Sequence, residues 1–233
     1  TKEQIFDMVR HQKELNFTPG EEMLYCNTGY TLLAEIVATV SGMPFTQFTR
    51  TFIFEPLAMN HTHFHDDHEM VVKNMAYSYS PGLDNNFKKS VLNYANVGAT
   101  SLFTTVEDLA KWNQNLEDGR VGGQNVIKHL HQTGVLNNGN KLDYAFGLAI
   151  NEYKGLKMVG HSGGDAGYRS FLCRFPDQRF SLVVLSNLAS FDPQGKAMEV
   201  VDVYLSDKFV IQQRESSEAE PAERDIAQVD PEI

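Results

Sequence analysis

The chain has 233 residues, of which 42% are hydrophobic, and a formal net charge of −10. A chain of this length can bury one substantial core. The acidic balance argues against nucleic-acid binding, which requires clustered lysine and arginine. No run of eighteen apolar residues occurs, so the sequence predicts no membrane span. Two cysteines, Cys26 and Cys173, are too few for a disulfide framework.

The first 132 residues are predicted to be mostly helical. Apolar residues recur at close to helical spacing over residues 2–15. A second apolar stripe covers residues 32–40 and ends at Gly42, which is typical of a helix with a glycine cap. Residues 45–53 are predicted to form a third helix. Residues 66–97 show little periodicity and are expected to be irregular and partly exposed.

A further helix is predicted to begin after Thr104 or Thr105, because either hydroxyl can cap it and two carboxylates follow in its first turn. A short helix around residues 126–131 comes next. Residues 144–150 are predicted to be a strand. Three β-prone runs within residues 156–186 are separated by short turn signals, which is typical of an antiparallel meander.

The predicted sheet and a final helix together occupy residues 140–208. Asp192-Pro193 is a start signal for that helix, whose apolar residues can pack on the sheet. Residues 210–233 are polar and acidic, and they are predicted to be a linker or disordered tail. The chain is therefore expected to hold one domain over residues 1–209.

Gly160-His161-Ser162-Gly163-Gly164 matches G-x-S-x-G, the nucleophile elbow of α/β-hydrolases. An elbow needs a helix directly after the serine and a later histidine. Here a strand-like run follows, and no histidine lies beyond Ser162. The better interpretation is that His161-Ser162-Gly163 corresponds to the Lys-Thr-Gly strand of penicillin-recognising serine enzymes. The alternative is that the motif is a glycine-rich hairpin in which the histidine has no functional role.

Tyr25 and Asn27 lie two residues apart before the second predicted helix, so they project to the same side of an extended segment. A phenol can shuttle a proton if nearby positive charge lowers its pKa. An amide can hold a substrate carbonyl. Taken alone, the two residues fit a core tyrosine and a capping asparagine better. Cys26 between them is expected to be a small buried side chain.

Taken together, these motifs resemble the serine β-lactamase-related family. The family includes class C β-lactamases, D-Ala-D-Ala carboxypeptidases, D-aminopeptidases and family-VIII-type esterases. The likeness covers roughly residues 1–208 in unbroken order. It implies an α+β fold in which an antiparallel sheet is flanked by helices, with a helical subdomain beside it. The active site would lie between the two parts, so Tyr25 and His161 are expected to share one cleft.

The resemblance also implies residue roles in acyl transfer. Tyr25 would relay protons to and from a serine nucleophile, and His161 would tune Tyr25 and orient the substrate. The backbone N–H of Gly164 would form half of an oxyanion hole. The implied substrate-binding residues are Asn27, Ser162, Gly163 and Gly164. The resemblance implies no cofactor and no metal, and it alone favours a periplasmic or secreted location.

The sequence departs from the family because no serine has a lysine three residues later. In the family this Ser-x-x-Lys motif comes many tens of residues before Tyr-x-Asn. We therefore expect the first sheet strands and the nucleophile helix to come from a segment before Thr1 or from another chain, and the present chain to be inactive alone. His161 stands where many relatives have lysine, which favours ester or peptide substrates over β-lactams.

A second hypothesis is a metal-dependent hydrolase. His63-Phe64-His65-Asp66-Asp67-His68 fits the H-x-H-x-D-H ligand run of the metallo-β-lactamase fold, and these side chains suit Zn²⁺. A further ligand would have to come from His129, His131 or His161. Against this, the run follows Pro56-Leu57-Ala58-Met59, which belongs to the other family's pattern. A solvated histidine-rich loop is the simpler interpretation.

The sequence thus predicts that the intact protein is a serine hydrolase acting on small amide or ester substrates through an acyl-enzyme. A third hypothesis is a non-catalytic binding module that kept the fold and lost the nucleophile.

Overall fold

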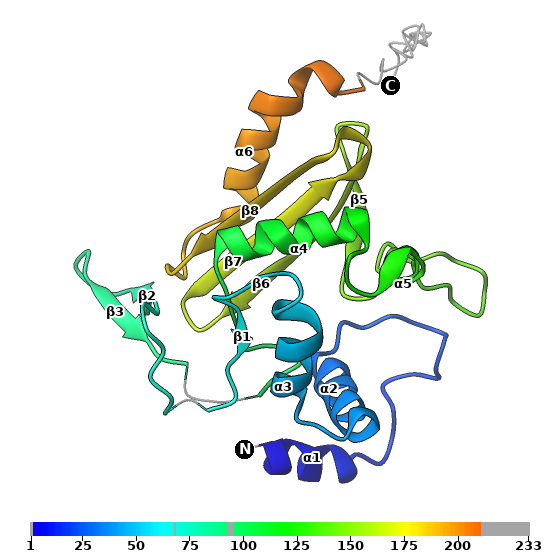
Figure 1. Cartoon of the computed structure of the whole chain (residues 1–233), viewed down its shortest axis with the longest axis vertical. Helices are drawn as coiled ribbons and strands as arrows, with labels where there is room; N and C mark the ends of the chain where they lie inside the picture. Colours follow the sequence, from blue (N-terminus) through cyan, green and yellow to red (C-terminus); the bar gives the residue numbers. More distant parts are fainter. Residues whose placement is uncertain (1, 68, 93–95, 211–233) are drawn as a thin grey trace, which may run out of the picture.

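Four antiparallel strands form the main sheet of the computed structural model, which describes residues 2–67, 69–92 and 96–210. The strand order β5-β6-β7-β8 follows the sequence, so short turns join neighbours (Figure 1). The predicted meander is therefore confirmed. The strands are β5 (Ala149–Tyr153), β6 (Leu156–Asp165), β7 (Tyr168–Phe175) and β8 (Phe180–Ser186).

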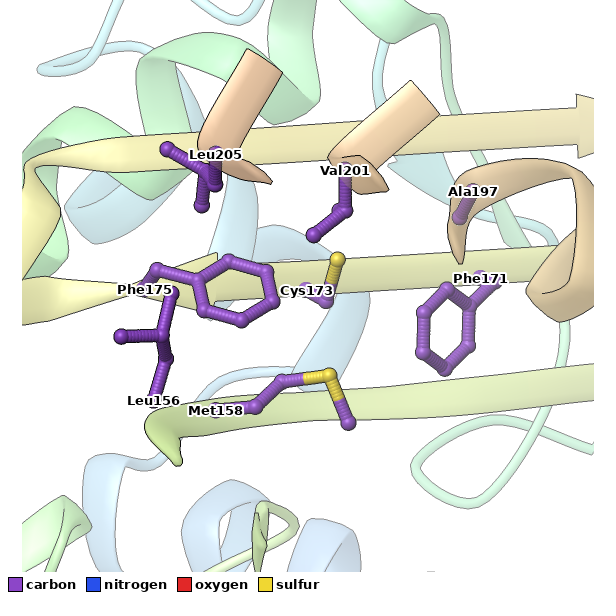
Figure 2. Packing of buried hydrophobic residues seen from close by; sticks show 8 residues of the cluster. All are labelled: Leu156, Met158, Phe171, Cys173, Phe175, Ala197, Val201 and Leu205. Carbon is purple, nitrogen blue, oxygen red and sulfur yellow. The ribbon is translucent and has the colours of Figure 1, made fainter. Parts of the chain in front are cut away.

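The two faces of this sheet are covered by different helices. Phe171, Cys173 and Phe175 alternate along β7 and belong to an apolar cluster with α6 (Pro193–Leu205), as Figure 2 shows. Arg174 lies between them in sequence and reaches the opposite face, where its guanidinium donates to the Leu116 carbonyl of α4 (Val106–Asp118). This alternation follows from the pleat of a strand.

Helix α6 forms where the sequence placed the final helix. Asp192 caps it, since its carboxylate accepts a hydrogen bond of 2.9 Å from the Gly195 N–H. Ala197, Val201 and Leu205 recur every four residues and are buried against the sheet (Figure 2). Their spacing gives the helix one apolar stripe, which fixes the face it turns to the strands.

Helix α4 also forms as predicted. The Thr105 hydroxyl accepts a hydrogen bond from the Asp108 N–H at the start of the helix, and Gly119 ends it in the left-handed region. Its inner face is more polar than the sequence suggested, because Asp108 and Asn115 are fully buried with Leu116, while Trp112 is only half-buried.

The N-terminal helices gather below the sheet, and one short helix lies to the right of its lower end (Figure 1). Helix α2 begins five residues before the predicted apolar stripe and ends at Gly42, which is left-handed as expected. Its Leu33, Ile36 and Val40 are exposed. Within the described ranges, no helix is both long and apolar enough to cross a bilayer. These helices are α1 (Lys2–Arg10), α2 (Asn27–Ser41), α3 (Phe45–Thr49), its π-helical continuation η1 (Arg50–Phe54) and α5 (Gly123–Leu130).

Two predictions on local structure were wrong. Residues 66–97 were expected to be irregular, but β2 (Ser78–Pro81) and β3 (Phe87–Ser90) form a projecting hairpin there (Figure 1). Its residues are largely exposed, so no alternating apolar pattern reveals it. Residues 144–150 were expected to form one strand, but β5 begins only at Ala149. Gly147 has a φ of 72°, and the chain turns there before the strand starts.

Shorter elements complete the fold. Strand β1 (His63–Phe64) pairs antiparallel with β4 (Leu102–Phe103), and short 3-10 turns η2 (Pro176–Gln178) and η3 (Ser206–Lys208) follow β7 and α6. The predicted tail begins at residue 210, and all but its first residue lie outside the described residues.

Val201→Ala should lower the free energy of unfolding by about 1.5–3 kcal/mol, because the Val201 side chain is fully buried between α6 and the sheet. Val203→Ala makes the same change two residues later on a side chain that is 76% exposed, and it should cost less than about 0.5 kcal/mol. Urea unfolding of both variants measures the difference. Equal losses would contradict the packing of α6 described here.

Candidate active site

A groove of about 2020 Å³ lies where the end of the main sheet meets the N-terminal helices. One part of the lining consists of Tyr25, Asn27, Tyr144 and the end of β6. A second part of the lining consists of the loop around Thr62 and the start of α4. Segments from all parts of the chain thus line one space.

The outer half of β6 has a free edge along this groove. Strand β5 pairs with β6 only opposite Leu156–Gly160, whereas β7 pairs with β6 out to Asp165. Among the described strands, residues 161–164 therefore have a partner strand on one side alone. An unpaired strand edge offers backbone N–H and C=O groups to an extended ligand. His161, Ser162, Gly163 and Gly164 all lie on this segment and line the groove.

Tyr25 ends an extended segment, and Asn27 is the first residue of α2. Asn27 therefore does not cap the helix, because Cys26 occupies the capping position and no side chain there accepts a hydrogen bond. Cys26 is exposed, so the expectation of a buried thiol was wrong. The extended geometry at Cys26 directs its side chain away from those of its two neighbours.

The structure brings Tyr25 and His161 together, with ring centroids 6.0 Å apart. Tyr25 comes two residues before α2, and the loop at Gly98 packs closely against that helix. A Cβ on Gly98 would lie 2.6 Å from the Tyr30 carbonyl oxygen and 2.7 Å from the Ala34 Cβ, so only glycine fits. The roles of Tyr25 and His161 stay predictions.

Tyr144 is a site residue that the sequence interpretation missed. Its hydroxyl lies 3.0 Å from Nε2 of His161, and its ring meets the Tyr25 ring edge-on at 6.1 Å. The sequence around it was interpreted as a strand, in which Tyr144 would be one alternating apolar residue. The glycine three residues later was the available signal that the chain turns there instead.

Asp108 holds the loop around Thr62 against the start of α4. It is fully buried, and its carboxylate accepts hydrogen bonds of 2.8 Å from the His61 N–H, the Thr62 hydroxyl and the Lys111 ammonium. Burial alone would raise the pKa of Asp108, but these donors outweigh it and hold the pKa below its ordinary value of 3.8. The Thr62 hydroxyl also contacts that of Thr104, which lines the groove.

The histidine run that follows Thr62 does not assemble as a metal site in the part of the chain that is described. Nε2 of His63 lies 3.3 Å from Nδ1 of His65, which is buried against Phe103. Burial and His65 lower the pKa of His63. Among the residues that the structure describes, no three His, Cys, Asp or Glu side chains come together to hold a metal ion. His68 of the predicted ligand run lies outside the described residues.

The antiparallel sheet, the helices on its faces and the groove at its free edge have the architecture of the β-lactamase and transpeptidase fold. The chain belongs to the β-lactamase family, because the family model described as Beta-lactamase matches residues 2–205. The predicted α+β fold and family resemblance are thereby confirmed.

Three known proteins illustrate the likeness. Penicillin-binding protein 4* of Bacillus subtilis strain 168 is 32% identical over 184 residues, covering 73% of this chain and 41% of the relative. The D-aminopeptidase of Brucella ovis is 24% identical over 185 residues, covering 79% and 35%. The octameric penicillin-binding protein homologue from Pyrococcus abyssi superposes with a TM-score of 0.79 at 27% identity, covering 88% and 48%. The chain thus spans less than half the length of each.

Asp108→Asn should destabilise the protein at neutral pH by about 1–3 kcal/mol, because the new NH₂ group would face buried donors. A depressed carboxyl pKa contributes stability above the unfolded-state value, and this contribution is lost as the pH falls through the folded-state value. The difference from wild type should therefore shrink below pH 3.8. Urea unfolding midpoints of wild type and variant, measured from neutral pH to below pH 3.8, give this difference in stability. Glu107→Gln, at an exposed carboxylate of the same helix, is the control. A pH-independent difference would contradict the account.

Proposed function

We propose that the protein containing this chain is a serine hydrolase that cleaves small amide or ester substrates through an acyl-enzyme intermediate. The observation that carries the proposal is the meeting of Tyr25 and His161, 6.0 Å apart, beside the free edge of β6. A proton-relay group and a strand edge that can align an extended substrate are what acyl transfer requires.

In the proposed reaction, a serine hydroxyl attacks the substrate carbonyl while Tyr25, acting with the lysine of the Ser-x-x-Lys motif, relays a proton from the serine to the leaving group. The N–H of Gly164 donates a hydrogen bond to the developing oxyanion, which is typically worth about 2.7–4 kcal/mol. Asn27 holds the substrate amide, and Ser162 and Gly163 lie along the substrate on the same strand. Water then hydrolyses the acyl-enzyme with Tyr25 acting again as the proton relay.

The nucleophile in this proposal belongs to a Ser-x-x-Lys motif outside these 233 residues, because no serine in the sequence has a lysine three residues later. The present chain alone is then inactive. The short share of each relative that the chain covers supports this division, since a further part of the relatives has no counterpart here.

Open-chain peptide and ester substrates are favoured over β-lactams. The D-aminopeptidase of Brucella ovis is a relative whose name specifies a peptide substrate with a D-residue, and a free strand edge suits an extended peptide. His161 stands where many relatives have lysine, which weakens the case for efficient β-lactam hydrolysis. The substrate class we propose is therefore a short peptide amide or an ester.

Labelling the intact protein with a fluorophosphonate probe tests the proposal, with the labelled peptide identified by mass spectrometry. One serine outside these 233 residues should be labelled. Tyr25→Phe should slow labelling and substrate turnover by about 10²–10⁴-fold, since a positioned acid–base group contributes that much. Tyr153→Phe is a matched control, because its hydroxyl bonds Asp202 and does not line the groove.

An unlabelled protein that still binds the substrate would overturn the hydrolase in favour of a binding module. Labelling of a serine within this chain would overturn the proposed origin of the nucleophile. Unchanged turnover in Tyr25→Phe would remove Tyr25 from the mechanism.

A chelator distinguishes the serine mechanism from the metal-dependent alternative, because only the alternative predicts that activity is lost. Prolonged dialysis against EDTA should leave the hydrolytic rate of the intact protein unchanged, because in the described residues His63 and His65 bond to each other rather than converge with further ligands. Metal analysis of the same samples provides the control. Stoichiometric zinc together with chelator-sensitive activity would favour the histidine run over the serine mechanism.

A further inference from the structure

The imidazole of His161 has a hydrogen-bond partner at each nitrogen. Nδ1 lies 2.5 Å from the Ser162 carbonyl oxygen, and Nε2 lies 3.0 Å from the Tyr144 hydroxyl. A backbone carbonyl can only accept, so Nδ1 carries a proton. In the neutral ring, Nε2 then has the lone pair, and the Tyr144 hydroxyl donates to it.

The surroundings of Tyr144 keep a proton on its hydroxyl, which the hydroxyl needs in order to donate to Nε2. Burial, together with the nearby hydroxyls of Tyr30 and Tyr25, raises the pKa of Tyr144 to about 12. The phenol therefore keeps its proton in neutral solution. The Tyr30 side chain packs beside the turn at Gly147, since a Cβ on Gly147 would lie 3.5 Å from the Tyr30 hydroxyl. Tyr144 comes three residues before this turn and lines the groove.

The rings of Tyr25, Tyr144 and His161 form a nearly equilateral triangle. Their centroids are 6.0 Å apart for Tyr25 and His161, 6.0 Å for Tyr144 and His161, and 6.1 Å for the two tyrosines. Two phenols thus flank one imidazole, which has a single lone pair to offer. Only one of the two hydroxyls can donate to it at a time.

We propose that Tyr144 is a positioning residue, which holds His161 as the neutral, Nδ1-protonated tautomer and keeps its Nε2 away from Tyr25. This inference rests on the proposed function, in which Tyr25 is the proton relay. With Nε2 occupied by Tyr144, the Tyr25 hydroxyl stays available to the nucleophile and the leaving group. Without Tyr144, Nε2 is open to Tyr25 and would compete for its proton.

Nitrogen-15 NMR of the intact protein labelled at histidine tests the proposal, with the His161 signals assigned from their loss in His161→Gln. In the wild-type protein, Nδ1 of His161 should carry a proton and Nε2 should carry none. In Tyr144→Phe the Nε2 signal should move, because Nε2 loses the hydrogen bond from Tyr144. Turnover should fall about tenfold with KM changed by less than about twofold, because the relay rather than substrate binding is affected.

Tyr153→Phe is the matched control. It removes one tyrosine hydroxyl that bonds Asp202 at 2.9 Å outside the groove, and it should leave both the His161 signals and turnover unchanged. This separates the loss of one particular hydrogen bond from a general loss of stability.

Two results would overturn the proposal. One is a wild-type His161 protonated at Nε2 instead of Nδ1, which needs no variant to observe. The other is a Tyr144→Phe protein whose His161 signals match those of wild type. Both are independent of the proposed function. If the His161 signals change as expected but no serine takes up the fluorophosphonate, the hydrolase proposal fails and the positioning of His161 by Tyr144 stands.

Discussion

The pairing of β6 with β7 is the constraint on which the site depends. It places Gly160 opposite Cys173 and His161 opposite Leu172. Because side chains alternate, Cys173 enters the apolar cluster under α6 while His161 faces the groove. A slip of one residue would exchange these faces and bury the imidazole among apolar side chains. Gly160 fits this register, since a Cβ there would lie 2.3 Å from the Leu172 carbonyl oxygen.

The two parts of the groove lining are held by different interactions. In the part with the tyrosines, close packing between α2 and the loop at Gly98 supports the segment that carries Tyr25 and Asn27. In the second part of the lining, the buried carboxylate of Asp108 accepts three hydrogen bonds. Two of them hold the loop at Thr62 against α4. A rigid site on packed elements can hold reacting groups more closely than one built on loops alone.

Much of the fold could be predicted because its signals are local. The glycine end of α2, the threonine cap of α4 and the Asp192 cap of α6 each depend on a few neighbouring residues. The hairpin of β2 and β3 could not, because its exposed strands carry no alternating apolar pattern. The strand predicted from residue 144 failed because a turn at Gly147 overrides the β-propensity of its neighbours.

The sequence by itself determined the meander, the capped helices and the identity of six groove residues, since strand periodicity, helix caps and short motifs each depend on a few neighbouring positions. Only the tertiary structure decided that Tyr144 meets His161, that β5 stops short of the end of β6, and that Thr62 bonds Asp108. The reason is physical: these contacts join segments whose separation is set by packing and chain path, which no local pattern encodes.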